Sequence, residues 1–384
     1  RVISNKERVN SARVRPLSYK ITPDCVGDTV TFSLSRPRNL SVEVNGDIFH
    51  NLHLFANPID KFRPSDKEIQ RALKKKKGSN LIYFAPGVHN LPNDTLFVPS
   101  GTTVYIDGGA RVYGNIFTEG AHDVNIFGRG EVHPDGRGAG VWVRRSKNVR
   151  IDGIVVSQLP IGQCDSVELT NVKSISYYGW GDGMDVFSSS NVILDGVFCR
   201  NSDDCAAVYA STQGFKGGSN NVLVKNATLW ADVAHPINIG GHGDPNGMDT
   251  VQNVTFRNID ILDQAENQID YQGCLAINPG DNTLVRNITF ENIRIEDFRN
   301  GQLVNFRISF NPKYCVSTGR GIQNVLVKDV TYNGSGENLS IIAGYDENHK
   351  IFGIRFVNLV VNGRKITDDM PGKPKWYKTG DMAG

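Results

Sequence analysis

One short strand pattern recurs along most of the chain. Each copy is a polar or small residue, an apolar residue, any residue, a second apolar residue and any residue. The copies occupy residues 103–107, 123–127, 148–152, 166–170, 191–195, 221–225, 253–257, 287–291, 324–328 and 352–356. Side chains two residues apart lie on the same face of a strand, so Val149 and Ile151 share an apolar face. One strand cannot bury that face alone, which predicts that successive copies stack on one another.

The spacing of the copies distinguishes between repeat architectures. Their first residues are about 18 to 37 positions apart, and the shorter intervals are near the length of one solenoid coil. The variable excess then forms loops at the corners of the coils, where binding clefts are usually built. A β-propeller would instead need about four strands in each repeat of roughly 40 residues. The shorter, irregular period favours an all-β protein built as a parallel β-helix.

The repeat also sets the domain boundaries that we expect. Residues 1–65 lack it but contain strand-like runs separated by turn signals, which predicts a small N-terminal β-sandwich or β-cap. Residues 66–80 are predicted to form a helix and linker that cover the open end of the solenoid. The lysine run 74–77 fits the solvated end of that helix better than a site for polyanions. The β-helix then takes residues 81–367, and an irregular tail takes residues 368–384.

Composition excludes several classes of function. The 384 residues carry a net charge of +2 and are 39% apolar, and no basic stripe points to nucleic acid. No run of 18 apolar residues marks a membrane span. The six cysteines lack zinc-ligand spacing, so several are expected to point inward and at most one disulfide is expected. Because the chain starts at Arg1 rather than Met, we expect an N-terminus from which a signal peptide has been removed.

Aspartates gather in the segment 179–205. Asp182 and Asp203 are 21 residues apart, about one coil, so we expect them to stack on the same face of adjacent coils. Carboxylates in such proximity repel each other, which raises the pKa of at least one of them. A protonated carboxyl beside an ionised one supplies the acid and base that glycosidic cleavage requires. The aspartates therefore predict a glycoside hydrolase.

These motifs resemble the signature of glycoside hydrolase family 28, the polygalacturonases and rhamnogalacturonan hydrolases. The similar segments are 182–185, Asp-Gly-Met-Asp, and 201–208, Asn-Ser-Asp-Asp-Cys-Ala-Ala-Val. The likeness extends over roughly residues 80–365. It implies a single-stranded, right-handed parallel β-helix of the pectin-lyase-like type and hydrolysis with inversion at the anomeric carbon. The N-terminal β-domain is also similar to that of family 49, the dextranases and isopullulanases, which act on neutral α-glucans.

The resemblance assigns roles to individual residues. It implies that Asp203 is the general acid, and that Asp182 and Asp204 hold and activate the attacking water. The family's Gly-His-Gly motif, which supports the acid, has two candidate matches. We favour His235, because the residues after it keep the apolar-polar-apolar-Gly pattern of the family; His242 matches the letters of the motif and is the less favoured candidate.

One departure from the family bears on the substrate. The family's Arg-x-Lys, which binds a uronate carboxylate, should fall in residues 267–272, where Asp270 and Gln272 replace the two cations. A carboxylate at that position would repel galacturonate. The departure favours a neutral sugar at the cleavage subsite, with hydroxyl groups donating hydrogen bonds to Asp270 and Gln272. The alternative is that both are solvated residues of the coil.

Other side chains are candidates for sugar contact. Trp180 and Tyr271 are expected to face the cleft and to stack on the C–H faces of sugar rings, although aromatic residues can equally form stacks inside the core. Arg307 is expected on the floor of a neighbouring coil, with a surface salt bridge as the alternative. These candidates complete a site for a polysaccharide or oligosaccharide.

Taken together, the sequence predicts a secreted, periplasmic or cell-surface inverting glycoside hydrolase. We expect a monomer that needs no cofactor or metal and has neither a nucleic-acid partner nor a membrane span. A polygalacturonase or rhamnogalacturonan hydrolase acting on pectin and a non-catalytic glycan-binding solenoid are alternatives. A polysaccharide lyase is a further one, but it would need a uronate substrate, and the missing Arg-x-Lys speaks against it.

Overall fold

The computed structural model describes residues 1–6, 8–74, 78–134, 136–336, 338–370 and 377–379. The chain divides into two compact units, Arg1–Lys61 and Phe62–Gly384. The first unit ends before residue 65, the boundary that we expected from the sequence. Among the described residues, none of the helices has the length and apolar character needed to cross a membrane.

The first unit is built from short antiparallel strands. Their bounds are β1 (Val2–Ile3), β2 (Ala12–Arg15), β3 (Asp24–Val26), β4 (Thr29–Thr31), β5 (Arg38–Val44) and β6 (Asp47–Ala56), with a 3-10 turn η1 (Leu17–Tyr19) after β2. They form two three-stranded sheets, in the orders β1-β4-β3 and β2-β5-β6. Val14, Leu40 and Val42 are buried between partly buried side chains such as Phe32 and Leu54. The turn signals in the sequence therefore mark real strand ends.

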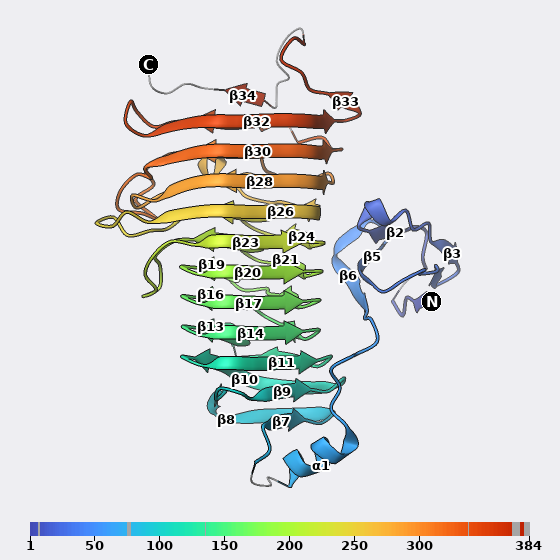
Figure 1. Cartoon of the computed structure of the whole chain (residues 1–384). Coiled ribbons are helices and arrows are strands. Elements are labelled where there is room, and N and C mark those ends of the chain that lie inside the picture. Colours follow the sequence, from blue (N-terminus) through green and yellow to red (C-terminus); the bar gives the residue numbers. More distant parts are fainter. Residues whose placement is uncertain (7, 75–77, 135, 337, 371–376, 380–384) are drawn as a thin grey trace. The chain divides into compact units, whose positions relative to one another are not determined.

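A single helix, α1 (Asp66–Leu73), precedes the solenoid. Its N-cap is Ser65, which forms a capping box with Glu68 and so satisfies backbone donors that the first turn leaves free. Ile69 is its buried residue, and α1 packs against the first strand of the solenoid (Figure 1). Of the lysine run that was expected to end this helix, residues 75–77 lie outside the described residues.

The second unit is a right-handed parallel β-helix, as predicted. Its strands join into one 28-stranded sheet that winds through three faces (Figure 1). The first face contains β7 (Leu81–Phe84), β9 (Thr103–Ile106), β11 (His122–Gly128), β14 (Lys147–Asp152), β17 (Asp165–Thr170), β20 (Ser190–Asp195), β23 (Asn220–Lys225), and the first halves of β26 (Thr250–Asp263), β28 (Leu284–Ile295), β30 (Gly321–Tyr332) and β32 (Lys350–Val361). The second face contains β12 (Glu131–His133), β15 (Val155–Val156), β18 (Lys173–Ile175), β21 (Phe198–Asn201), β24 (Thr228–Ala231) and the second halves of β26, β28, β30 and β32.

The third face is the one that later carries the site. It contains β13 (Val141–Arg144), β16 (Ile161–Gly162), β19 (Val186–Phe187), β22 (Ala206–Tyr209), β25 (Ile237–Ile239), β27 (Leu275–Ile277), β29 (Val304–Arg307), β31 (Ser340–Ala343) and β34 (Tyr377–Thr379). The strands β8 (Gly87–Phe97) and β10 (Ala110–Glu119) are long enough to serve both the second and the third face. The short β33 (Arg364–Lys365) pairs antiparallel with β32. The third face has shorter strands and longer connecting loops than the first.

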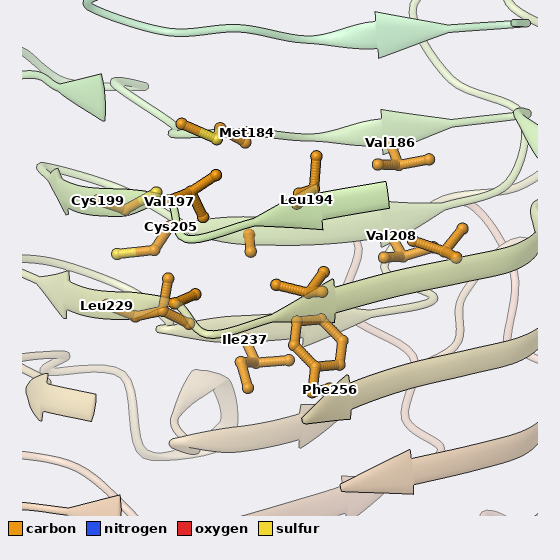
Figure 2. Packing of buried hydrophobic residues seen from close by; sticks show 14 of the residues in the cluster. Met184, Val186, Leu194, Val197, Cys199, Cys205, Val208, Leu229, Ile237 and Phe256 are labelled. Atoms are coloured by element: carbon orange, nitrogen blue, oxygen red, sulfur yellow. The ribbon is translucent and has the colours of Figure 1, made fainter. Parts of the chain in front are cut away.

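The repeated apolar pairs of the sequence form the core. Val167 pairs with Val192 and then Val222, while Leu169 pairs with Leu194 and then Val224, so equivalent side chains stack along the solenoid. All of these are essentially inaccessible to solvent. Figure 2 shows further side chains of this interior, including two cysteines, between strands of neighbouring coils. Burying one Val or Leu contributes about 1.5–3 kcal/mol, so the regular stack is the main source of stability.

Asparagine ladders explain the polar residue that opens many copies of the repeat. Asn221, Asn253, Asn287 and Asn324 all have left-handed φ angles near the start of a first-face strand, a conformation that Asn tolerates better than most residues. Each side-chain amide in this row donates to a side-chain oxygen at the equivalent corner of the previous coil, as from Asn287 to Asn253 at 3.1 Å. The residue type thus fits both the backbone turn and the stacking.

Most of the cysteines lie in the interior, as expected. Cys164, Cys199, Cys205 and Cys274 are buried as small apolar groups, and Cys25 and Cys315 are half-buried. All six lie within the described residues and are free thiols, so the single disulfide that the sequence allowed is not formed.

Candidate active site

Two adjacent coils carry the aspartates, at the edge where the third-face strands begin. Asp182 lies in the loop that leads into β19, and Asp203 and Asp204 lie in the loop that leads into β22. The backbone amide of Gly183 donates to the carbonyl oxygen of Asp204 at 2.7 Å, and Met184 donates to Cys205 at 2.9 Å. The parallel ladder therefore starts at the aspartates, and stacking of the coils places the carboxyl groups together, as their spacing predicted.

Asp204 is a buried carboxylate with an unusually complete set of donors. Its Oδ1 accepts from the backbone amide of His235 at 3.0 Å and lies 2.7 Å from His235 Nδ1. Its Oδ2 accepts from the hydroxyl of Tyr209 at 2.6 Å and from the amide of Asn238 at 2.8 Å. Burial alone would raise its pKa, but the interaction with His235 and the hydrogen bonds from Tyr209 and Asn238 hold the pKa below its usual value. Asp204 is thus the ionised member of the cluster.

The neighbouring carboxyl groups shift in the opposite direction. Burial raises the pKa of Asp203 to about 8, and the negative charges of Asp204 and Asp182 add to the effect. Burial likewise raises the pKa of Asp182 to about 7, with the charge of Asp204 contributing. Asp185, fully buried, is hydrogen-bonded to Asp182, and burial and the charge of Asp182 raise its pKa well above the usual value. Asp203 is only partly buried, so a protonated carboxyl that solvent can reach lies beside an ionised one.

The two histidine candidates occupy different places. His235 is completely buried and contacts Asp204 through its ring and its backbone, whereas His242 packs edge-on against the ring of Tyr209 at 5.0 Å. Since an ionised carboxylate can only accept, His235 Nδ1 is the donor of the hydrogen bond to Asp204. Within the described residues, His235 Nε2 has no hydrogen-bond partner. The histidine that the strand pattern favoured is therefore the one beside an aspartate.

The two aromatic candidates, Tyr271 and Trp180, differ in their contacts and in their exposure. Tyr271, in the 3-10 turn η2 (Ile269–Tyr271), packs edge-on against His235 at 4.2 Å. Its hydroxyl lies 3.5 Å from Asp204 Oδ2 and accepts from the amide of Asn238 at 3.4 Å. Trp180, by contrast, is 67% exposed in the loop before β19, and Gln158 donates to its carbonyl oxygen at 2.8 Å. Tyr271 therefore belongs to the aspartate cluster, and Trp180 presents an open ring surface.

The structure places Asp270 and Gln272 in different surroundings. Gln272 is completely buried, where its amide donates to the carbonyl of Glu266 at 2.5 Å and its oxygen accepts from Asn338 at 3.0 Å. It faces protein on all sides, so the prediction that it binds a sugar hydroxyl is wrong. Asp270 is exposed but forms an ion pair with Arg307. Its charge is balanced, so the repulsion of galacturonate that the sequence suggested at this position is weakened.

Several residues of the site were not singled out from the sequence. Asn238 lies in the alternating strand after His235, between the core residues Ile237 and Ile239, and this alternation could have identified it as a groove residue. Tyr209 ends β22 and reaches back to Asp204. Asn201 holds the backbone of Asp182 by donating to its carbonyl oxygen at 3.1 Å. Among the described residues, no group of three or more His, Cys, Asp and Glu side chains is placed to hold a metal ion.

Comparison with known proteins gives a consistent family likeness. Residues 135–370 match the model of glycosyl hydrolases family 28. An exopolygalacturonase of Cochliobolus carbonum is 24% identical over 47% of this chain and 44% of its own length. An endopolygalacturonase of Emericella nidulans is 25% identical over 67% of this chain and 72% of its own. A probable endo-xylogalacturonan hydrolase of Neosartorya fischeri is 29% identical over 42% of this chain and 38% of its own. The chain thus spans less than half the length of two of these three relatives.

Solved structures share the fold. A Yersinia enterocolitica family 28 exopolygalacturonase superposes with a TM-score of 0.58 at 13% identity, covering 95% of this chain and 86% of that chain. Dex49A from Penicillium minioluteum gives a TM-score of 0.57 at 14% identity, covering 99% and 80%. At such low identity the likeness establishes the architecture and nothing finer.

Proposed function

Because the chain belongs to glycosyl hydrolases family 28, we propose that it hydrolyses glycosidic bonds with inversion, using Asp203 as acid and Asp204 with Asp182 as base. One observation carries this proposal: a partly exposed carboxyl whose pKa is raised to about 8 adjoins a buried carboxylate whose pKa is lowered. Two carboxyl groups in opposite protonation states at neutral pH are what acid–base cleavage of a glycoside requires.

The roles follow from protonation and exposure. Asp203 retains its proton at neutral pH and donates it to the oxygen of the leaving sugar. Asp204 is ionised and fixed by His235, Tyr209 and Asn238, so it acts as the base that accepts the proton lost by the attacking water. Asp182, whose pKa is near 7, shares that task. The water attacks the anomeric carbon on the face opposite the leaving group, and the product emerges with inverted configuration.

We propose further that the sugar at the cleaved bond is neutral. On the third face, Asn238 pairs with Ala276, and Ala276 pairs with Asn305. These positions alternate with core residues and so point away from the core. They carry amides and a methyl group and are covered, so this part of the third face offers no cation that would bind a uronate.

A galacturonate-containing glycan is the second candidate, because specific cations lie near the aspartates. The hydrogen bond with Tyr314 raises the pKa of Lys313, and the negative charges of Glu266 and Asp203 add to this effect. Arg307 lies above the floor, paired with Asp270. The sequence relatives are named for galacturonan and xylogalacturonan hydrolysis, which favours the same candidate. Either candidate substrate is a large glycan outside the cell, so we propose that the protein is secreted. We also propose that it acts as a monomer.

The test is a panel of glycans with a direct assay of stereochemistry. The protein is incubated with polygalacturonate, xylogalacturonan, dextran and a neutral galactan, and new reducing ends are measured. The first-formed anomer is then identified by proton NMR. Release of a product with inverted configuration by the wild type, and none by Asp203→Asn, is the expected result. Cleavage confined to polygalacturonate would contradict the neutral-sugar proposal, and an unsaturated product absorbing in the ultraviolet would indicate a lyase instead.

A further inference from the structure

The outward surface of the third face, between the loops that enter and leave its strands, forms the groove, and beyond Asp204 the floor of this groove is covered. Asn238, Ala276 and Asn305 point away from the core, yet each is at most 1% exposed. Outward-facing side chains on a β-helix face are buried only where other chain segments lie over them. The β27 entry loop, residues 264–274, lies over them: the hydroxyl of Tyr271 accepts from Asn238, and Gly273 lies against Asn305. The β29 exit loop, residues 308–320, contacts this first loop in turn. A substrate cannot lie on the floor at this point.

The two loops start from opposite edges of the third face and meet above it. Tyr271 of the β27 entry loop stacks on Tyr314 of the β29 exit loop, with ring centroids 4.8 Å apart and planes inclined by 21°. The amide of Gln268 donates to the hydroxyl of Tyr314 at 3.2 Å, and the ammonium of Lys313 donates to Gln268 Oε1 at 3.3 Å. We call these four residues the cross-groove bridge.

A second link lies beside the bridge. Asp270 of the β27 entry loop pairs with Arg307 at the end of β29, and the backbone carbonyl of Arg307 accepts from Asn278 at 3.3 Å. The ion pair ties the same loop to the next coil. Three kinds of interaction therefore span the groove within adjacent coils: aromatic stacking, hydrogen bonds and an ion pair. Together they hold the two loops against each other at several points.

The bridge adjoins the reacting groups directly. The hydroxyl of Tyr271 lies 3.5 Å from Asp204 Oδ2, and its ring packs against His235. On the opposite side of the aspartates, towards the N-terminal coils, Tyr177 and Trp180 are exposed by 87% and 67%. The groove is thus closed next to the catalytic carboxyl groups on one side and offers open aromatic surface on the other.

We propose that the cross-groove bridge makes this protein an end-acting hydrolase: the end of a glycan chain stops against Tyr271 and Tyr314, and the rest of the chain runs over Trp180. An internal segment of a polymer would have to continue through the bridge, so it cannot place its glycosidic bond at Asp203. This inference rests on the proposed function and adds the mode of cleavage, which the family likeness does not fix because both exo- and endo-acting relatives match.

The product pattern of the wild type provides the first test. Whichever of polygalacturonate, xylogalacturonan, dextran and galactan is cleaved is sampled at low conversion, and products are separated by length while viscosity is followed. A single short product from the earliest time, with little loss of viscosity per bond broken, is the expected result. A ladder of many lengths with an early fall in viscosity overturns the inference. Failure to cleave any of the four glycans contradicts the proposed function itself, which is a different result.

Removing the bridge provides the second test. Tyr314→Ala removes the stacking partner and the hydroxyl without touching Asp203 or Asp204, and should raise the viscosity lost per bond broken severalfold. Tyr314→Phe keeps the stacked ring and should retain the wild-type pattern. Tyr345→Ala is the matched control, because Tyr345 lies on the next exit loop and packs on His349 of that same loop.

The folded state of each variant is checked by thermal unfolding, and Gln268→Ala gives an independent way to weaken the bridge. Internal cleavage by Tyr314→Ala or Gln268→Ala, but not by Tyr314→Phe or Tyr345→Ala, supports the inference. An unchanged single product from folded Tyr314→Ala and Gln268→Ala would show that the bridge does not determine where the chain is cut.

Discussion

On the first face of the solenoid the buried apolar pairs and many corner asparagines repeat from coil to coil, whereas on the third face equivalent positions beside the aspartates carry different side chains. Asn253 and Asn287 occupy equivalent corners and donate along the same ladder. Asn238 and Ala276 are equally equivalent by register, yet one holds a catalytic candidate and the other bears only a methyl group. The comparison shows that stacking of equivalent side chains provides stability where the coils are alike. Where long loops and polar substitutions make neighbouring coils different, the same stacking creates a site.

The largest expected effect is on the third face. Asp203→Asn removes the transferable proton and should lower kcat by about 10²–10⁴-fold, the usual range for a general acid. Glu168→Gln is the control, since it neutralises an exposed carboxylate on the first face, which faces Arg150 at 3.9 Å. Reducing-end assays on the same glycan compare the two variants. A comparable loss in Glu168→Gln would contradict the division of labour between the faces.

The same Asp203→Asn variant tests charge repulsion within the site. The pKa of Asp203 is raised on folding, so between about pH 4 and about pH 8 the folded state binds more protons than the unfolded state. Its contribution to stability therefore falls as pH rises through that window. Asp203→Asn lacks the titrating group and should gain stability over the wild type as pH increases. Thermal unfolding across this range measures the difference, and parallel curves would refute the raised pKa.

Removal of His235 should affect both stability and activity. In His235→Ala, Asp204 loses a buried hydrogen-bond donor, and losing a hydrogen bond to a charged group costs about 1.5–3 kcal/mol. The pKa of Asp204 should rise, so the acidic limb of the pH–activity profile should move to higher pH. His242→Ala is the matched control because His242 contacts the ring of Tyr209 rather than Asp204. Equal effects of the two substitutions on the acidic limb would indicate that His235 is not the positioning residue.

On the first face the expected effects concern stability alone. Leu194 is fully buried and stacks between Leu169 and Val224, so Leu194→Ala should lower the free energy of unfolding by about 2–5 kcal/mol. At temperatures where the variant remains folded, kcat should not change. Ile193→Ala, at the adjacent half-buried position, should be milder. A large change in kcat for folded Leu194→Ala would show that the core of this face is coupled to the site.

The smallest effect is expected at the asparagine ladder. Asn253 has a φ angle of 56°, and an ordinary L-residue in that conformation costs about 1–2 kcal/mol. Asn253→Ala should lose about that much stability with unchanged activity, measured by denaturant unfolding. Asn253→Gly should recover part of the loss, because glycine adopts positive φ readily. If Ala and Gly behave alike, the ladder hydrogen bond rather than the backbone turn dominates.

This contrast also explains what could be predicted from the sequence. The solenoid was predictable because Val167, Leu169 and their equivalents follow a local period that the fold preserves. Asp182, Asp203 and His235 were identified because their spacing and strand pattern keep that register. Gln272 was misplaced because it lies in the β27 entry loop, where the repeat is interrupted and residue order no longer indicates direction.

Contacts between loops could not be predicted from the sequence for the same reason. Arg307 was given a salt bridge as one of its two interpretations, but its partner, Asp270, lies far from it in the chain. The stacking of Tyr271 on Tyr314 joins loops from opposite edges of a face, and no periodic pattern encodes their approach. Such contacts depend on loop length and on the exact path of each loop over the coil beneath it.

The central claim is that Asp203 is protonated at neutral pH beside an ionised Asp204. It is tested most directly by carbon-13 NMR titration of aspartate carboxyl groups in the wild type, with Asp203→Asn and Asp204→Asn used to assign the two signals. We predict that the Asp203 carboxyl titrates near pH 8 and that the Asp204 carboxyl stays ionised to below its usual pKa. An Asp203 carboxyl that titrates near pH 4 would contradict the account.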